Sequence, residues 1–123
     1  MEKIKKMKNI ILKKVFFLFT TLILILNTAC SLTVPVRGSV QNTDEAFTGT
    51  ATGYLDRSGV LTITSNKGTT CTGNFVYATA RQGEGVFICD DGRSGPFTFV
   101  STGLKGTGYG DLGGSRFTFT FGN

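Results

Sequence analysis

The sequence has no histidine and no tryptophan among its 123 residues, and it has only three cysteines and two prolines. Without histidine, the chain can build no Ser-His-Asp or Cys-His catalytic arrangement and no histidine-ligated metal site. Three cysteines are too few for a four-cysteine zinc site within one chain. The length supports one domain. We therefore expect a single domain that is poor in catalytic residue types and holds no metal or cofactor.

The net charge of +5 is concentrated at the beginning of the chain. Six lysines and one glutamate precede residue 30, which leaves seven basic and seven acidic residues after it. A neutral domain gives no electrostatic reason to expect nucleic acid or an anionic membrane surface as a partner. We therefore expect no nucleic-acid partner.

Residues 1–29 have the pattern of a secretory signal peptide. A lysine-rich segment over 1–14 is followed by a twelve-residue apolar run over 15–26 and by the small and polar residues Asn27-Thr28-Ala29. The apolar run is shorter than the roughly 20 residues that cross a bilayer as a helix. This length favours cleavage over the alternative, an uncleaved membrane anchor.

The stretch Leu26-Asn27-Thr28-Ala29-Cys30 resembles the lipobox of bacterial lipoproteins. Thr28 and Ala29 fit the family pattern, whereas Asn27 stands where the family usually has Leu or Val. The resemblance implies that Cys30 is diacylated, becomes the mature N-terminus and anchors the protein to a membrane, an anchor that two or three acyl chains make stable. Ser31 after the cysteine implies the periplasmic face of the outer membrane.

The composition changes along the exported part of the chain. Residues 30–46 are of mixed polarity without a clear period, and we expect a lipidated N-terminus and a tether there, with Thr33–Val40 as a candidate edge strand. Over 47–123, Gly, Thr and Phe dominate, and short β-rich runs alternate with turn signals. This pattern predicts an all-β domain, an antiparallel meander of about seven short strands that forms a curled sheet or a small half-open barrel.

The turns predict how the strands pair. A two-residue turn at Gly113-Gly114 and a turn near Ala80 each place the glycines of one strand opposite phenylalanines of the next. The predicted pairs are Gly110–Phe117, Gly108–Phe119, Gly106–Phe121, Phe75–Gly85, Gly73–Phe87 and Cys71–Cys89. Continuing through a turn at 90–94 pairs Phe97 with Phe87 and Phe99 with Gly85.

This register gathers seven phenylalanines on one face of the sheet. They are Phe75, Phe87, Phe97, Phe99, Phe117, Phe119 and Phe121, and Thr, Ser and Asn dominate the other face. Such a face needs cover, and two alternatives remain open. Either the sheet curls until the face closes on itself, or an envelope protein or a second copy of the chain covers it.

Similar glycine and phenylalanine motifs recur 22 to 23 residues apart, as in Gly73-x-Phe75 and Gly95-x-Phe97. Together with Gly83-x-Gly85 and Asp91-Gly92-Arg93, they resemble the MORN repeat, a β-hairpin unit stacked into an elongated sheet. The resemblance covers about two units and lacks the tyrosine and tryptophan that mark the family. It implies a scaffold or membrane-apposed module rather than an enzyme.

Cys71 and Cys89 are predicted to form a disulfide. Export places them in an oxidising compartment, and the lipid attachment at Cys30 leaves an even number of cysteines. The alternative, a redox couple, lacks the Cys-x-x-Cys spacing or helix N-terminus that would lower a thiol pKa. A structural disulfide is therefore favoured.

The turn Asp90-Asp91-Gly92-Arg93 concentrates charge. Its two carboxylates are too few for calcium, which takes six to eight oxygens, and its residue types suit a tight turn. Asp90, Asp91 and Arg93 remain candidates for a recognition loop.

Two functions remain open. The first is a small exported cell-envelope lipoprotein that acts as a non-catalytic binding or structural module. The alternative is a histidine-free envelope enzyme that acts on polysaccharide through Asp90, Asp91 or Glu84, with Arg93 or Arg81, on neighbouring loops.

Overall fold

The computed structural model describes Lys13, Lys14 and residues 31–123 of the chain. The expected signal peptide over 1–29 and the lipidation site at Cys30 therefore lie outside the described residues, apart from the two lysines. Ser31–Asn123 form one compact unit. Among the residues described, there is no helix long and apolar enough to cross a membrane.

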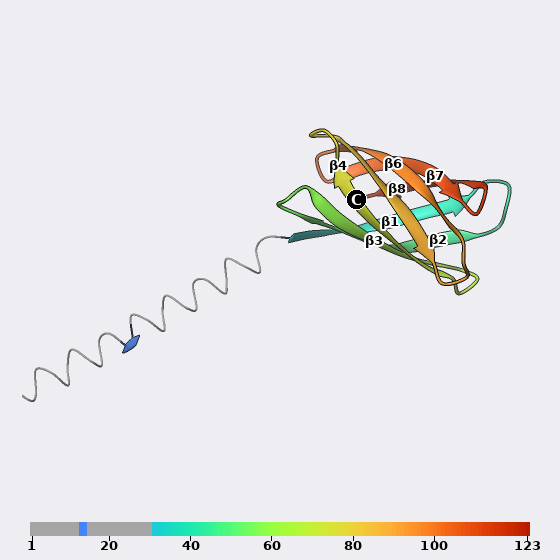
Figure 1. Ribbon diagram of the computed structural model, residues 1–123, viewed down its shortest axis with the longest axis horizontal. Coiled ribbons are helices and arrows are strands. Elements are labelled where there is room, and N and C mark those ends of the chain that lie inside the picture. The colour runs from blue at the N-terminus through green and yellow to red at the C-terminus, as the bar shows by residue number, and fades with distance from the viewer. Residues whose placement is uncertain (1–12, 15–30) are drawn as a thin grey trace, which may run out of the picture. The chain divides into compact units, whose positions relative to one another are not determined.

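Eight antiparallel strands form a closed barrel in which each strand pairs with its sequence neighbours and the first pairs with the last (Figure 1). The strands are β1 (Ser31–Val40), β2 (Ala46–Tyr54), β3 (Ser58–Ser65), β4 (Thr70–Tyr77), β5 (Gln82–Cys89), β6 (Ser94–Thr102), β7 (Lys105–Leu112) and β8 (Ser115–Phe121). The predicted antiparallel meander is confirmed. It has eight strands, where about seven were predicted, and the pairing of β1 with β8 closes it into a barrel rather than leaving it half open.

The eighth strand comes from the segment that we expected to be mostly a tether. β1 begins at Ser31 and pairs with β2 along its length and with β8 from Val36 onward. Val36 and Val40 are buried, and Gly38 lies between them on the same face, so the segment has the two-residue period of a half-buried strand. The domain therefore begins at residue 31 rather than 47, and the pairing of β1 with β8 closes the barrel.

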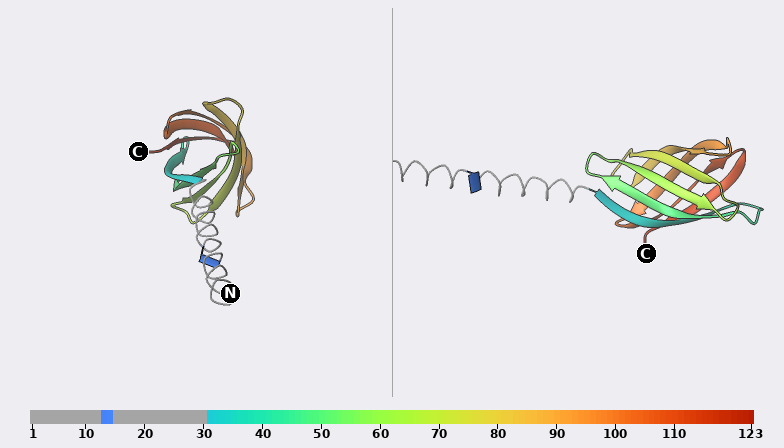
Figure 2. Two further views of the ribbon diagram at one scale, coloured as in Figure 1. Left: turned by 90° about the vertical axis from the view of Figure 1, so that its left-hand side faces the viewer. Right: turned by 90° about the horizontal axis from the view of Figure 1, so that it is seen from below.

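The strands wrap around a central interior (Figure 2). Buried side chains fill this interior, as expected for an eight-stranded barrel. The buried apolar residues are Val36, Val40, Phe47, Ala51, Leu61, Ile63, Cys71, Phe75, Phe87, Cys89, Phe97, Phe99, Leu112, Phe117 and Phe119. Six of the seven predicted phenylalanines are among them, and Phe121 is partly buried against the cluster. The phenylalanine face is thus covered by closure of the sheet on itself, and the first two hairpins add Phe47, Leu61 and Ile63 to it.

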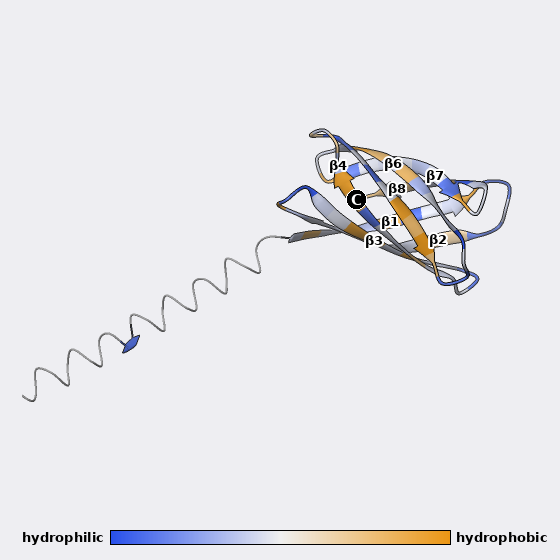
Figure 3. Cartoon of the chain, in the orientation of Figure 1, coloured by the Kyte–Doolittle hydropathy of each residue, from blue (hydrophilic) through white to orange (hydrophobic). Residues whose placement is uncertain are grey.

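Hydropathy alternates along the strands, and Figure 3 shows hydrophobic stretches interrupted by hydrophilic ones along the ribbons. Phe97 is 1% exposed, whereas the neighbouring Thr98 is exposed. Thr118 and Thr120 are exposed on either side of the buried Phe119. The predicted assignment of the two faces is confirmed.

Both hairpin registers are confirmed in every predicted pair. The pairing between β5 and β6 is corrected by two residues, because Phe97 lies opposite Gly85 and Phe99 opposite Gly83. The turn is tighter than expected, since Gly92 takes a φ of 90° that a side chain would disfavour and its N–H donates to the carbonyl of Cys89. A shift of two residues keeps every side chain on its face, so the core prediction is unaffected.

Glycines in the barrel wall leave room for phenylalanine rings. A methyl group added at Gly83, Gly106 or Gly108 would overlap the ring of Phe99, Phe121 or Phe119, respectively. These rings therefore cover the opposite backbone directly, which compensates for the weakness of glycine in a strand.

Candidate functional site

The two ends of the barrel differ in chemistry. We call one the ionic end; it consists of the loops 41–45, 66–69, 90–93 and 113–114. We call the other the apolar rim; it consists of the start of β1 (31–35) and the loops 55–57, 78–81 and 103–104. The predicted recognition loop belongs to the ionic end.

Arg93 joins two loops of the ionic end. Its Nη1 and Nη2 donate to the two carboxylate oxygens of Glu45 at 2.6 and 2.9 Å, and its Nε donates to Oδ2 of Asp91 at 2.8 Å. Glu45 is only 6% exposed, although it is charged. The hydrogen bond from Arg93 lowers the pKa of the Glu45 carboxyl below its usual range, and the two carboxylates raise the pKa of the guanidinium. This bidentate pair compensates the burial of the carboxylate.

The carboxylates of the predicted recognition loop bond mainly within the ionic end. Asp91 accepts the backbone N–H of Arg93, the first cause of its lowered pKa, and Thr69 donates to it as well. Asp90 accepts the backbone N–H of Thr70. The structure therefore brings all three candidate residues together, but the guanidinium donors are used in holding the loops to one another.

Sequence reasoning missed Glu45, which is the main partner of Arg93. The two residues are 48 positions apart, and nothing in the segment around Glu45 distinguishes it from a solvated loop carboxylate. Only closure of the barrel brings the loop 41–45 beside the loop 90–93.

The residues of the predicted polysaccharide enzyme do not all lie on neighbouring loops, because Glu84 and Arg81 lie away from the loop 90–93, which corrects that expectation. Asp90 and Asp91 follow β5 at the ionic end, whereas Arg81 precedes β5 at the apolar rim. Glu84 lies on the exposed face of β5, six residues before Asp90, or about 20 Å along an extended strand. The two carboxylate positions are thus too far apart to flank one glycosidic bond, which needs roughly 5–10 Å.

Cys71 and Cys89 form the predicted disulfide between β4 and β5. The two cysteines are 0% and 5% exposed and belong to the hydrophobic cluster. Burial of this kind suits a bond that stabilises the barrel more than one that exchanges electrons with a partner.

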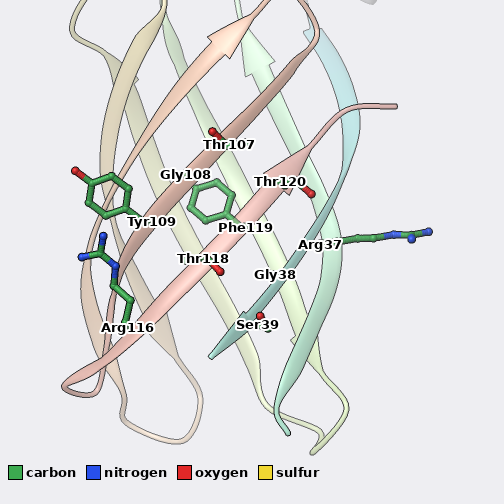
Figure 4. Close-up of a pocket in the computed structure, with 10 residues that line it drawn as sticks. All are labelled: Arg37, Gly38, Ser39, Thr107, Gly108, Tyr109, Arg116, Thr118, Phe119 and Thr120. Carbon is green, nitrogen blue, oxygen red and sulfur yellow. The ribbon is translucent and has the colours of Figure 1, made fainter. Parts of the chain in front are cut away.

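A shallow depression of about 580 Å³ lies on the wall formed by β1, β7 and β8 (Figure 4). The guanidinium of Arg116 stacks over the ring of Tyr109, 4.2 Å from its centroid. Arg37 also lines the depression, and its side chain extends on the side opposite this pair. The cations therefore do not converge on one point, and the exposed Thr107, Thr118 and Thr120 between them provide hydroxyls alone.

Metal binding finds no support among the residues that the structure describes, since no group of three or more His, Cys, Asp or Glu side chains is placed to hold an ion.

No family model matches the sequence, and no curated protein matches it. Among solved structures, the chain is similar to a de novo designed, fluorescence-activating β-barrel, with a TM-score of 0.58 and 13% identity. The match covers 74% of this chain and 90% of that chain. At this identity the likeness concerns the fold alone: this chain is built as a closed antiparallel β-barrel.

Proposed function

We propose that the protein is a small exported cell-envelope lipoprotein whose barrel is a non-catalytic binding or structural module. The observation that carries the proposal is that the three cysteines divide into a bonded pair and one remaining cysteine. Cys71 and Cys89 are joined inside the barrel, and Cys30 is left at the end of a segment with the pattern of a signal peptide. The anchor would place the barrel on the periplasmic face of the outer membrane.

The disulfide supports export, because such bonds persist mainly in secreted and periplasmic proteins. The filled interior and the engaged Arg93 support a role in binding or structure, since the chemistry-bearing residues of the ionic end hold the barrel together. The separation of Glu84 from Asp90 and Asp91 does not favour the enzyme alternative.

The test is the mass of the mature N-terminus. The full chain is expressed in a Gram-negative bacterium, and the N-terminal peptide of the mature protein is analysed by mass spectrometry. We expect it to begin at Cys30 and to carry a diacylglyceryl group. The double variant Cys71→Ala/Cys89→Ala is the matched control, because it loses the other two thiols and should keep the lipid.

A mature protein with an unmodified Cys30, or a chain that is never cleaved, would contradict the lipoprotein proposal. Hydrolysis of a polysaccharide by the purified barrel, lost in Asp90→Asn/Asp91→Asn, would instead support the enzyme.

A further inference from the structure

We propose that the apolar rim lies against the surface of the bilayer that anchors the protein, with its basic residues among anionic lipid headgroups. The inference rests on the proposed function, because it needs the acyl chains at Cys30. It adds an orientation: the barrel is docked on the membrane by one end and does not hang from a flexible tether.

The barrel begins at the residue directly after Cys30. β1 begins at Ser31, and Ser31 is already paired with Tyr54 of β2. Neighbouring Cα atoms are about 3.8 Å apart, so the chain has no free length between Cys30 and the rim. Acyl chains attached to Cys30 therefore hold the start of β1 at the level of the headgroups.

Exposed apolar side chains gather at the apolar rim. Leu32, Leu55 and Leu104 of the rim are 51%, 80% and 60% exposed, and the adjoining Tyr54 is 47% exposed. The loops of the ionic end contain none of the exposed large apolar side chains. Leucine and tyrosine are suited to the boundary between headgroups and acyl chains, where one part of a side chain can be dry and another wet.

The apolar rim also carries basic side chains. The loop residues Arg57 and Arg81 and the adjoining Lys105 bring three cations to it, whereas its loops contain one acidic side chain, Asp56. That carboxylate accepts both the backbone N–H and the hydroxyl of Ser58.

The loops of the ionic end have the opposite balance, with more carboxylates than cations. They contain Asp44, Glu45, Asp90 and Asp91, against Lys67 and Arg93. The neutral sum over the domain therefore conceals a basic end and an acidic end. An anionic bilayer attracts the basic one.

A protein strand is a poorer occupant of this end. From residue 31 to 35, β1 pairs with β2 but not with β8, which leaves a short free edge. The carbonyl of Pro35 points to the β8 side, where it accepts the N–H of Gly122. The N–H and C=O of a strand residue point to the same side, and proline has no N–H, so this edge has no donor at position 35. Ser31 and Thr33 alone remain to pair, too few for a docked strand.

The absence of tryptophan from the chain allows a direct test with a single reporter. Lipidated Leu55→Trp is reconstituted in phosphatidylcholine–phosphatidylglycerol vesicles whose acyl chains are brominated, and its fluorescence is compared with that in unbrominated vesicles. The matched control is Ile88→Trp, at an exposed apolar site of β5 (67% exposed) next to the ionic end. We expect at least twofold quenching of the reporter at position 55 and none at position 88.

The outcomes separate the two proposals. If the protein floats with the vesicles but position 55 is not quenched, the docking of the rim is wrong and the anchor stands. If the protein does not float with the vesicles, the lipid anchor itself is wrong. If fluorescence at position 55 shifts to the blue with protein concentration in detergent, without lipid, a second copy covers the rim and the inference is overturned.

A charge variant tests the headgroup contact. Arg57→Gln/Arg81→Gln/Lys105→Gln in the reporter chain should reduce the quenching in anionic vesicles. The control Arg37→Gln/Lys67→Gln/Arg116→Gln removes the same charge elsewhere and should leave the quenching unchanged. Equal effects of the two triple variants would show that net charge, not the rim, controls binding.

Discussion

The ionic end and the apolar rim are built from loops of similar length, yet they are held in different ways. At the ionic end, side chains join loops that are distant in sequence: Arg93 bonds to Glu45, and the side chain of Asn66 bonds to the backbone of Asp44 and Ala46. At the apolar rim, Asp56 and Thr79 bond within their own loops. Side chains thus join distant loops at the ionic end. At the apolar rim, the carbonyls of Arg57 and Arg81 accept the backbone N–H groups of Tyr77 and Ser101 in neighbouring strands, but the described side chains do not join one loop to another.

The difference shows how a small barrel can separate stability from contact with a partner. A buried ion pair stabilises only when both partners are in place, so the ionic end tolerates little change. Tyr77 and Phe121 at the other end are partly buried against Phe99, with ring centroids 5.3 and 5.6 Å away. These rings seal the interior there, so the loops of the apolar rim are free to meet a different surface.

The core that both ends share should show the largest effect. Phe97→Ala should cost about 3–5 kcal/mol, because the ring is 1% exposed and packs on Phe87, with centroids 4.2 Å apart. Urea unfolding followed by circular dichroism measures the loss. Thr98→Ala, on the exposed face beside it, is the control and should change the free energy of unfolding by less than about 0.5 kcal/mol. Similar losses in both variants would contradict the assignment of the two faces.

Removing the disulfide should destabilise the barrel by a comparable amount. Cys71→Ala/Cys89→Ala should cost on the order of 3 kcal/mol, since the bond joins residues 18 positions apart and restricts the unfolded chain. Chemical denaturation with and without reductant measures it. The native protein should lose stability on reduction and the double variant should not. A native midpoint that is insensitive to a reductant strong enough to free both thiols would argue against the bond.

Breaking the ion pair should separate the two ends most clearly. Arg93→Met leaves the buried Glu45 carboxylate without its partner and should cost about 3 kcal/mol. Arg81→Met, the matched change at the apolar rim, should cost less than about 0.5 kcal/mol. Thermal unfolding measures the change in Tm of the two variants. Equal changes would contradict the view that ionic contacts stabilise one end and not the other.

Acid should weaken the ionic end first. The folded-state pKa of Glu45 lies below its ordinary value near 4.5, chiefly through the hydrogen bond from Arg93, so the folded protein binds fewer protons than the unfolded chain. Its contribution to stability is complete above that value and is lost as the pH falls through the folded-state pKa. Unfolding measured between pH 7 and pH 3 should show this decline in the native protein and a smaller one in Glu45→Gln.

The smallest effect on stability should come from the exposed leucines of the rim. Leu55→Ser and Leu104→Ser should change the free energy of unfolding by less than about 0.5 kcal/mol, because both side chains are mainly in solvent. Differential scanning calorimetry of the two variants measures this. A loss above about 1 kcal/mol would mean that these side chains support the barrel.

Local patterns predicted the parts of the fold that local geometry determines. Gly113 and Gly114 both have positive φ, which fixes the last hairpin and with it the burial of Phe117 and Phe119. The first strand was underestimated because Val36 and Val40 alternate with polar residues in a segment without aromatic residues. Its role depends on pairing with β8, some 80 residues away, which no local pattern reveals.

The chemistry of the two ends was harder to predict, for the same reason. Glu45 and Arg93 become partners only when the barrel closes. Successive loops lie at alternate ends of the barrel, and this alternation separates the basic loops from the acidic ones. The charge summed over the whole domain is neutral, so it did not predict a basic rim around Arg57 and Arg81.

Hydrogen–deuterium exchange on the lipidated protein, in detergent and in anionic vesicles, tests the distinction between the two ends most directly. We predict that amides of the loops 55–57 and 103–104 exchange readily in detergent and more slowly in vesicles. Amides of the loops 41–45 and 90–93 should exchange at the same rates in both, because they are hydrogen-bonded within the protein and the Arg93–Glu45 contact holds the two loops together. Vesicle-dependent protection at the ionic end, or its absence at the apolar rim, would contradict the account.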